Sequence, residues 1–136
     1  MESTPQRISS YKYLIVWQKA LDLVTEVYAA TSGFPRKEMF GLTSQLRRSA
    51  VPVPSNVAEG QGRATKGEFI QFLSPARGSL YELETQIVIA GRLGYLLAER
   101  EHALAARAEE VARILNGLLT SLGVASRKLS TVDAPR

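Results

Sequence analysis

The amino-acid sequence predicts an all-α protein, an antiparallel up-down-up-down four-helix bundle. Four stretches place apolar residues three and four positions apart, and no stretch alternates apolar and polar residues between turn signals. The connections between the stretches are short, which makes consecutive helices antiparallel neighbours. With 136 residues the chain has the length of one domain. We expect the bundle to span residues 11–124, between flexible polar tails at 1–10 and 125–136.

The first helical stretch ends before Gly33 and carries two apolar stripes side by side. The stripe that we expect to face the core is Leu14, Trp17, Leu21, Val24 and Tyr28. The second stripe is Val16, Ala20, Leu23 and Val27. Together they make the helix apolar over about half its circumference, whereas an outer helix of one bundle needs a stripe only somewhat over 100° wide.

This surplus apolar surface predicts self-association, because long exposed apolar strips usually mark partner surfaces. The alternative is a first helix that is sunk deeply between two neighbours of a single bundle. The residues expected at the interface between copies are Val16, Leu23 and Val27 of the first helix and Tyr81 and Val88 of the third.

The second helical stretch starts near Glu38 and contains two prolines. Its apolar face consists of Leu42, Leu46, Ser49, Val53 and Val57. A proline inside a helix removes a hydrogen bond and clashes with the preceding turn, at a cost of about 3 kcal/mol. We therefore expect this helix to kink or break at Pro52/Pro54, with a short segment that restarts at Pro54. Ser55 and Asn56 are candidates to reorganise the hydrogen bonds of the freed carbonyls of Arg48 and Ala50.

The third and fourth stretches have clear boundaries. The third opens with a capping box of Thr65 and Glu68 and ends at Gly91-Arg92-Leu93-Gly94. Its apolar positions are Phe69, Phe72, Leu73, Ala76, Leu80, Leu83, Ile87 and Ala90. The fourth runs from about Glu99 to Gly123, as expected for a glycine just beyond a helix end. Its apolar positions are Leu104, Ala108, Val111, Leu115, Leu118 and Leu122.

The composition excludes several classes of function. The chain has no cysteine, which excludes thiol catalysis, zinc–thiolate sites and a secreted disulfide framework, and we expect a cytoplasmic protein. No run approaches the roughly 20 apolar residues of a membrane span. His102 is the only histidine, and a metal site in a helix bundle needs two Glu-x-x-His elements where the chain offers one. We expect no metal, no cofactor and no enzymatic activity.

The net charge is +4, and the excess lies in one segment. Seven basic and three acidic residues lie between Arg36 and Arg77, while the rest of the chain holds ten of each. Such a segment attracts an anionic partner, although a solvated face is an equally good interpretation. The candidates for contacts to nucleic-acid phosphates, RNA foremost, are Arg47, Arg48, Arg63, Lys66 and Arg77.

A polar ridge lies beside the apolar face of the second helix. It contains Gln45, Arg48, Pro52, Asn56 and Glu59, and its geometry suits a buried network, an interface or a ligand surface. Glu82 of the third helix is a plausible partner for Arg48, as is Glu84. We expect Gln45, Asn56, Glu59 and Glu82 to serve structure. If that motif only builds a subunit interface, the alternative function is a protein-interaction scaffold.

Four stretches of sequence together carry a family resemblance over roughly residues 11–122. They are Tyr13-Leu14-Ile15-Val16-Trp17, Phe34-Pro35-x-x-Glu38-x-Phe40-Gly41-Leu42-Thr43-Ser44-Gln45-Leu46-Arg47-Arg48, Pro54-Ser55-Asn56-Val57-Ala58-Glu59-Gly60 and Ala76-Arg77-Gly78-Ser79-Leu80-x-Glu82-Leu83-Glu84-Thr85-Gln86. The sequence resembles the four-helix-bundle family of 23S ribosomal RNA intervening-sequence proteins. The resemblance implies a bacterial cytosolic protein that assembles as a ring-like homopentamer, with a largely undefined activity. Retroelement accessory proteins that share this fold bind nucleic acid and a reverse transcriptase through basic surfaces.

The sequence departs from the family pattern at two places. Pro52 stands where the family usually has serine, and Ser74-Pro75 interrupts the third helix where an apolar pair is more usual. Both departures put the straightness of the central helices in question. From the residues and the resemblance together we expect a non-enzymatic homo-oligomer that binds RNA through a basic surface.

Overall fold

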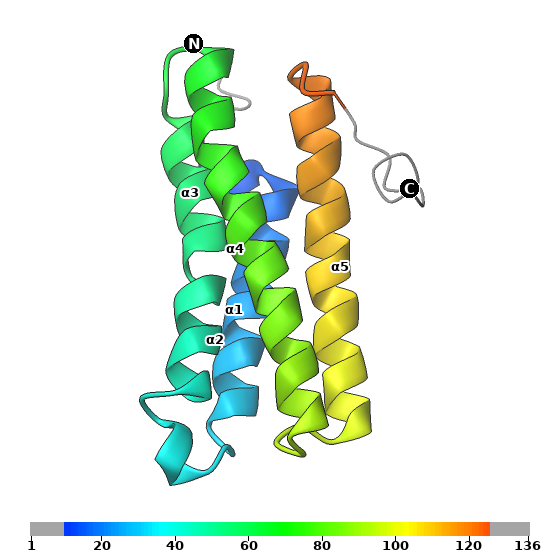
Figure 1. Cartoon of the computed structure of the whole chain (residues 1–136). Coiled ribbons are helices and arrows are strands. Elements are labelled where there is room, and N and C mark those ends of the chain that lie inside the picture. Colours follow the sequence, from blue (N-terminus) through cyan, green and yellow to red (C-terminus); the bar gives the residue numbers. More distant parts are fainter. Residues whose placement is uncertain (1–9, 126–136) are drawn as a thin grey trace, which may run out of the picture.

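The computed structural model describes residues 10–125, and this part of the chain contains helices and no strand (Figure 1). The tails predicted at 1–10 and 125–136 fall almost entirely outside it. In chain order the elements are η1 (Tyr11–Tyr13), α1 (Ile15–Thr31), η2 (Arg36–Glu38), α2 (Leu42–Ala50), α3 (Pro52–Gln61), α4 (Lys66–Arg92) and α5 (Ala98–Ser121).

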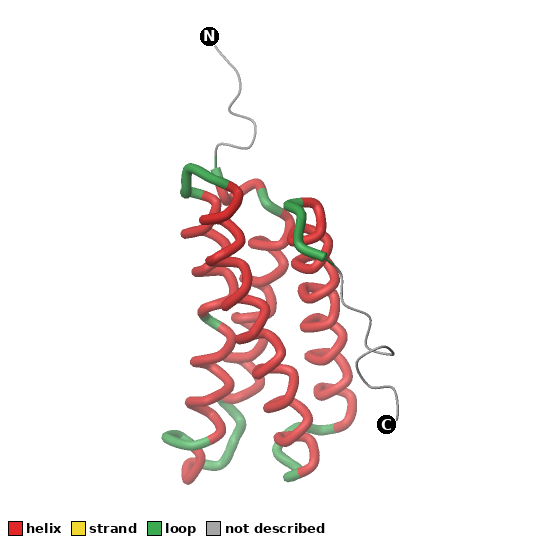
Figure 2. The backbone as a smooth tube through the Cα atoms, turned by 45° about the horizontal axis from the view of Figure 1, so that its top comes forward, coloured by secondary structure: helices red, strands yellow, loops and turns green. Residues whose placement is uncertain are grey.

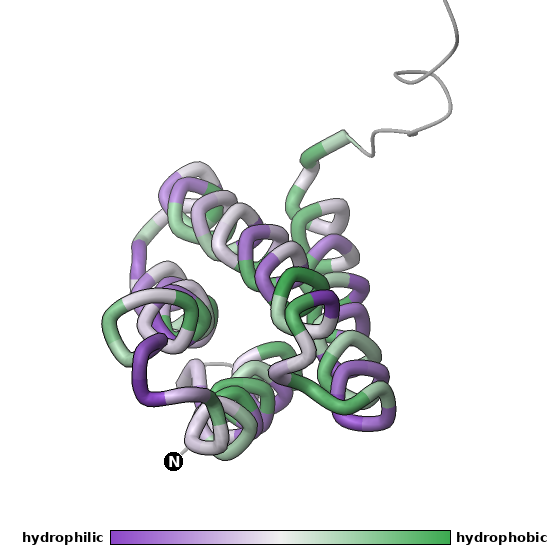
Figure 3. The backbone as a smooth tube through the Cα atoms, turned by 60° about the horizontal axis from the view of Figure 1, so that its bottom comes forward, coloured by the Kyte–Doolittle hydropathy of each residue, from purple (hydrophilic) through white to green (hydrophobic). Residues whose placement is uncertain are grey.

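The helices form an antiparallel bundle in which α2 and α3 share one column (Figure 1). This column packs against α1 on one side and α4 on the other, and α5 closes the ring by packing against both α1 and α4. Figure 3 looks at the bundle from one end and shows the helices around a common axis. The predicted fold class is confirmed.

The predicted kink lies at Val51, between α2 and α3, where Figure 2 shows a short interruption in the column. Val51 keeps helical angles (φ −60°, ψ −40°), so the chain bends without leaving the helical region. Helix α3 begins at Pro52, two residues earlier than expected, because a proline at the first helical position lacks only a donor that has no partner there.

Ser55 and Asn56 bond to carbonyls other than the predicted ones. Ser55 donates to the Val51 carbonyl and Asn56 donates to the Pro52 carbonyl, each at 3.0 Å. The reason is local, because short polar side chains in a helix reach the carbonyl four residues back. The carbonyls of Arg48 and Ala50 lie too early in the chain for this contact.

The predicted helix ends have the expected hydrogen bonds. The Thr65 side chain accepts from the Glu68 amide at 3.1 Å, and the Glu68 carboxylate accepts from the Ala64 amide at 3.2 Å. Gly94 and Gly123 have positive φ angles of 80° and 104°. In both places the amide three residues past the last helical residue donates to a carbonyl of the last turn, which closes a Schellman motif.

The core confirms the apolar faces predicted for the later helices. The predicted face of the α2–α3 column is buried throughout, with Ser49 included. In α4 and α5 the predicted positions are buried or partly buried against the core. Pro75 lies on the exposed side of α4, which continues unbroken from Lys66 to Arg92, so this departure from the family pattern does not interrupt the helix.

Helix α1 faces the core with the stripe that the sequence analysis assigned to the outside. Val16, Leu23 and Val27 are at most 2% exposed in the single chain. Their assignment to an interface between copies is therefore wrong. In the stripe predicted to face the core, Leu21 is 37% and Tyr28 is 41% exposed.

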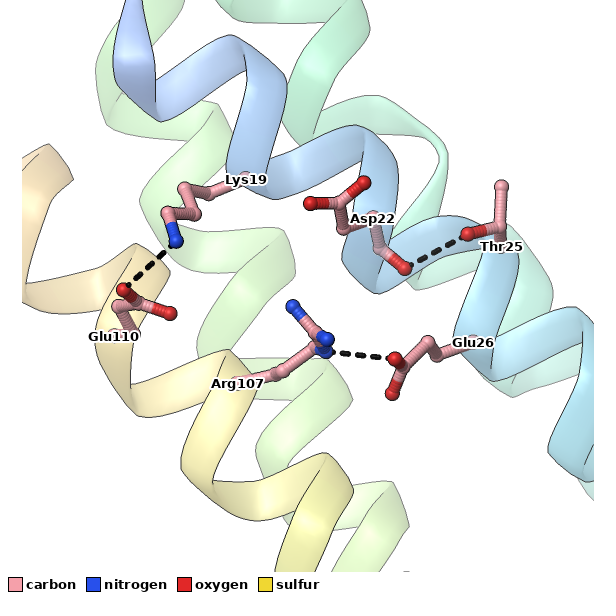
Figure 4. A network of polar contacts seen from close by, with 6 residues as sticks. All are labelled: Lys19, Asp22, Thr25, Glu26, Arg107 and Glu110. Atoms are coloured by element: carbon pink, nitrogen blue, oxygen red, sulfur yellow. Dashed lines mark hydrogen bonds and ion pairs between the residues drawn. The ribbon is translucent and has the colours of Figure 1, made fainter.

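Contacts on both flanks of α1 accompany this rotation. Toward α5, Lys19 pairs with Glu110 at 3.2 Å and Arg107 pairs with Glu26 at 2.8 Å (Figure 4). On the opposite flank, Arg47 of α2 lies 4.4 Å from the centroid of the Tyr28 ring. The stripe midway between these flanks is the one that turns inward, because the helix must meet both neighbours at once.

Helices α3 and α4 approach each other closely at Gly60. A Cβ atom at this position would lie 2.8 Å from Cδ1 of Phe69 and 2.9 Å from Cβ of Phe72. Real Cβ atoms do not approach other atoms so closely. The absence of a side chain at Gly60 therefore lets the two helices pack at this distance.

Candidate nucleic-acid interface

Three of the five cations predicted to contact phosphate have partners inside the chain. Arg47 caps the C-terminal end of α1, where its Nε donates to Thr31 Oγ1 at 2.9 Å and its Nη2 donates to the Tyr28 carbonyl at 3.4 Å. A cation is favourable there because the carbonyl end of a helix carries partial negative charge. Arg47 thus has a structural role whether or not it binds a ligand.

Arg63 and Arg77 are also engaged. Arg63 pairs with Glu59 at 3.3 Å, one helical turn away, and its guanidinium lies 4.6 Å from the centroid of the Phe72 ring. Arg77 of α4 donates to Asn116 Oδ1 of α5 at 3.1 Å, and the Asn116 amide donates to the Tyr81 hydroxyl at 3.2 Å. Both arginines therefore tie neighbouring segments together.

Arg48 and Lys66 are the two candidates that remain. Both are exposed, and within residues 10–125 neither side chain forms an ion pair or hydrogen bond. Arg48 lies in the last turn of α2, beside the kink, whereas Lys66 begins α4, beyond the far end of α3. At 1.5 Å of rise per residue, the stretch from Arg48 to Gln61 alone spans roughly 20 Å. The five predicted cations thus do not gather in one compact patch.

A different pair of cations does converge. Arg36 of η2 and Arg47 of α2 line one cavity of about 260 Å³, between the C-terminal end of α1 and the start of α2. The other lining residues are Thr31, Ser32, Phe34, Pro35, Met39 and Thr43. The sequence analysis did not name Arg36 or Thr43 as site residues. The one feature of the sequence that could have indicated this site is Thr43, a polar residue next to Leu42 of the apolar face of α2.

Glu38, the one acid between Arg36 and Arg48, is committed to the fold. One carboxylate oxygen accepts from the Leu42 amide at 2.9 Å and the other accepts from the Tyr95 hydroxyl at 2.9 Å. The amide bond first and the Tyr95 bond second lower the pKa of Glu38, and the same contact raises the pKa of Tyr95. This carboxylate therefore stays ionised. It accepts from the first amide of α2, and through Tyr95 it anchors the connection between α4 and α5.

The predicted structural motif does not form one network. Gln45 and Glu82 are exposed, Glu59 pairs only with Arg63, and Asn56 bonds within its own helix. Glu82 and Glu84 form no ion pair with Arg48.

The buried polar contact between the column and α4 involves other residues. Ser49 donates to Gln86 Oε1 at 2.7 Å, and both side chains are at least nine-tenths buried. Ser49 had been placed on the apolar face, and the partner on α4 explains why a hydroxyl is tolerated there.

Glu84 lies on the side of α4 that faces α5. Burial first, and the charge of Glu109 second, raise its pKa. Among residues 10–125 no three histidine or acidic side chains gather as a metal-binding group would require. Within the same range no helix combines the length and hydropathy of a membrane span.

Comparison with known proteins decides the family. The model of the 23S rRNA-intervening sequence protein family matches residues 12–117, most of the chain. The protein belongs to this family. Comparison with curated proteins gives no match.

The fold also agrees with a solved relative. The structure resembles the crystal structure of a protein of unknown function from the S23 ribosomal protein family of Bacteroides thetaiotaomicron, with a TM-score of 0.70 and 19% sequence identity. The match covers 77% of this chain and 98% of that one. At this identity the likeness concerns the fold. The family's description and this neighbour's unknown function name no enzymatic activity.

Proposed function

We propose that the protein is a non-enzymatic homo-oligomer that binds RNA through the cations around η2 and α2. The observation that carries the proposal is the charge of this segment. Arg36, Lys37, Arg47 and Arg48 lie within thirteen residues, and the carboxylate of Glu38 among them is already bonded on both oxygens. The family's description, which refers to 23S rRNA, supports RNA as the anion. A cytoplasmic location is supported by the cysteine-free composition.

Self-association is part of the proposal. It is supported by exposed apolar residues of α1, α4 and the kink, and not by the buried stripe of α1. Leu21 and Tyr28 leave apolar surface on the outside of α1, and Val51 at the kink is 41% exposed. Tyr81 and Val88 of α4 are 45% and 44% exposed, as an interface would require. The family resemblance implies five copies. Assembly would bring several copies of the weak basic segment to one RNA, which raises its effective affinity.

Salt dependence tests RNA binding directly. A fluorescein-labelled single-stranded RNA is titrated with the full chain at several salt concentrations, and fluorescence anisotropy gives the affinity. Phosphate contacts release counterions, so the logarithm of the association constant should fall linearly with the logarithm of salt concentration, by about 0.7 per contact. Affinity that does not change with salt would refute the proposal.

Two charge variants locate the surface. We expect Arg36→Gln with Arg48→Gln to reduce the salt slope by roughly 1.4, because two contacts are lost at about 0.7 each. The matched control is Arg113→Gln with Arg100→Gln, which removes two exposed arginines of α5 and should leave the slope unchanged. Equal losses in both double variants would mean that only net charge matters.

A protein-interaction scaffold is the second candidate function. This function is favoured by the contacts of Arg47, Arg63 and Arg77 with other residues of the chain. These contacts give the three arginines a structural role that does not require RNA. Light scattering at micromolar concentration separates the two candidates when combined with the titration above. An oligomer that binds no RNA supports the scaffold. A mass equal to one chain argues against both candidates as stated, because each is a homo-oligomer.

A further inference from the structure

In the cavity beside the end of α1, two arginines line a common space with three hydroxyl-bearing residues. Arg36 and Arg47 line it, together with Thr31, Ser32 and Thr43. Phe34, Pro35 and Met39 complete the lining, and no acidic residue belongs to it. The local charge inside the cavity is therefore positive.

The nearest acid in sequence, Glu38, keeps its negative charge but is not part of the lining and forms no ion pair with Arg36 or Arg47. Glu38 lies between Arg36 and Met39 in the chain, yet its two carboxylate oxygens bond to the Leu42 amide and the Tyr95 hydroxyl. The carbonyl end of α1 is the remaining negative feature. The positive charge of Arg47 offsets the partial negative charge of this helix end, because Arg47 donates a hydrogen bond to the Tyr28 carbonyl.

Hydrogen-bond donors are left over after all these contacts. A guanidinium has five N–H donors, and Arg47 uses two of them, toward Thr31 and Tyr28. The Thr31 and Ser32 hydroxyls donate to backbone carbonyls of α1. Thr43 is different, because the residue is only 8% exposed and its hydroxyl forms no hydrogen bond within residues 10–125. Buried hydroxyls normally have a partner, so this one points to a ligand.

We propose that this cavity binds a phosphate group, held by the guanidinium groups of Arg36 and Arg47 and by the Thr43 hydroxyl. Arginine forks match the oxygen spacing of phosphate and hold it through paired charge-assisted hydrogen bonds. At about 260 Å³ the cavity is smaller than the roughly 300–1,000 Å³ of pockets that enclose whole small molecules. It suits one phosphate with part of the group attached to it, and the apolar side chains of Phe34 and Met39 suit that attached part.

The phosphate can come from an RNA backbone or from a small phosphate ester. The first source rests on the proposed function, and the second does not. Both share the chemistry that Arg36, Arg47 and Thr43 recognise. The experiment therefore has one arm for each source.

NMR titration with inorganic phosphate tests the cavity itself. The full chain is titrated at constant ionic strength, with sodium chloride as the reference salt. We expect saturable shifts of the Thr43 amide and the Arg47 Nε–H signal with phosphate and none with chloride. Shifts of equal size with both salts would overturn the proposal.

Variants at the cavity separate a specific site from general attraction. Thr43→Val keeps the shape and removes the hydroxyl, and we expect it to weaken phosphate binding roughly tenfold, the usual effect of losing a hydrogen bond to a charged group. Arg36→Gln should weaken binding too, most strongly at low salt. Thr120→Val and Arg113→Gln change exposed residues of α5 and serve as controls. Unchanged phosphate affinity in both cavity variants would refute the site.

The RNA arm repeats the anisotropy titration with Thr43→Val. Weaker RNA binding in this variant assigns the phosphate to the RNA backbone. Unchanged RNA binding beside lost phosphate binding assigns it to a small ester, for which adenosine monophosphate is the probe. If RNA binds neither the parent chain nor the variant while phosphate still shifts the signals, the proposed RNA-binding function is refuted and the phosphate site is supported. If RNA binds and phosphate causes no shifts, the phosphate site is refuted and the RNA-binding function is supported.

Discussion

The rotation of α1 yields the sharpest prediction, because two leucines two residues apart should behave in opposite ways. Leu23 is fully buried in the single chain, while Leu21 is 37% exposed. We expect Leu23→Ala to destabilise the folded chain strongly. Leu21→Ala should leave the folded chain almost unchanged and weaken any association between copies.

The magnitudes follow from burial. Truncation of a fully buried leucine to alanine costs about 2–5 kcal/mol, from lost transfer energy and from the cavity left behind. A partly exposed leucine such as Leu21 should cost about 1 kcal/mol or less. At 0.05–0.15 kcal/mol per residue, the whole chain is stabilised by roughly 7–20 kcal/mol. The Leu23 variant should therefore still fold, with a large fraction of its stability lost.

Urea unfolding followed by circular dichroism measures both effects. With a denaturant slope of about 2 kcal/mol per molar urea, a loss of 3 kcal/mol lowers the midpoint by roughly 1.5 M. Each variant should be measured at two protein concentrations, because the stability of an oligomer depends on concentration. Light scattering on the same samples gives the number of copies.

One result would refute the reasoning. If Leu23→Ala kept the urea midpoint of the parent chain and dispersed the oligomer, while Leu21→Ala lowered the midpoint, the outward stripe would be Val16, Leu23 and Val27. That outcome would restore the orientation expected from the sequence alone.

Three further predictions concern packing and charge. Gly60→Ala should destabilise the chain by about 1–3 kcal/mol in thermal unfolding, because the added Cβ meets the two phenylalanines of α4. The control is Gly78→Ala, where the added Cβ lies in open space and should stabilise the helix by about 0.5–1 kcal/mol. Equal effects of the two substitutions would contradict the close approach of α3 and α4. Ser49→Ala should cost about 1–3 kcal/mol because it leaves the buried Gln86 oxygen unpaired, and adding Gln86→Leu should recover part of it. The pKa of Glu84 is raised in the folded state, so the folded state holds this proton more tightly than the unfolded state does. Stability should therefore fall as the pH rises from the unfolded-state pKa through the folded-state pKa of Glu84. Glu84→Gln should accordingly raise the melting temperature at neutral pH and not at about pH 3, and a pH-independent gain would contradict the assignment.

The sequence was informative wherever a local pattern has one structural solution. The capping box at Thr65 and the glycines at 94 and 123 each satisfy the hydrogen bonds of their own helix end, so no distant residue can change the outcome. The prolines at 52 and 54 likewise fixed the place of the kink. They did not fix its extent, because Val51 keeps helical angles when the helices on either side hold it in line.

The candidate site was predicted less well. The basic segment was found, but the partners that engage Arg47, Arg63 and Arg77 come from elsewhere in the chain or depend on how side chains turn. Arg36 and Thr43 line one cavity at the connection between α1 and α2. This arrangement depends on the path of that connection, which composition and spacing do not specify.

What the sequence determined by itself is the set of helices, their ends and their antiparallel order, since these follow from periodicity, capping and short connections. Only the tertiary structure decided which side of α1 turns inward. Both stripes of that helix are apolar, so the sequence pattern alone does not say which one is buried more deeply. Val16, Ala20, Leu23 and Val27 fill the interior that the other helices form, and this interior exists only once the helices have come together. The exposed contacts of α1 with Glu110, Arg107 and Arg47 lie on its two flanks and add little energy.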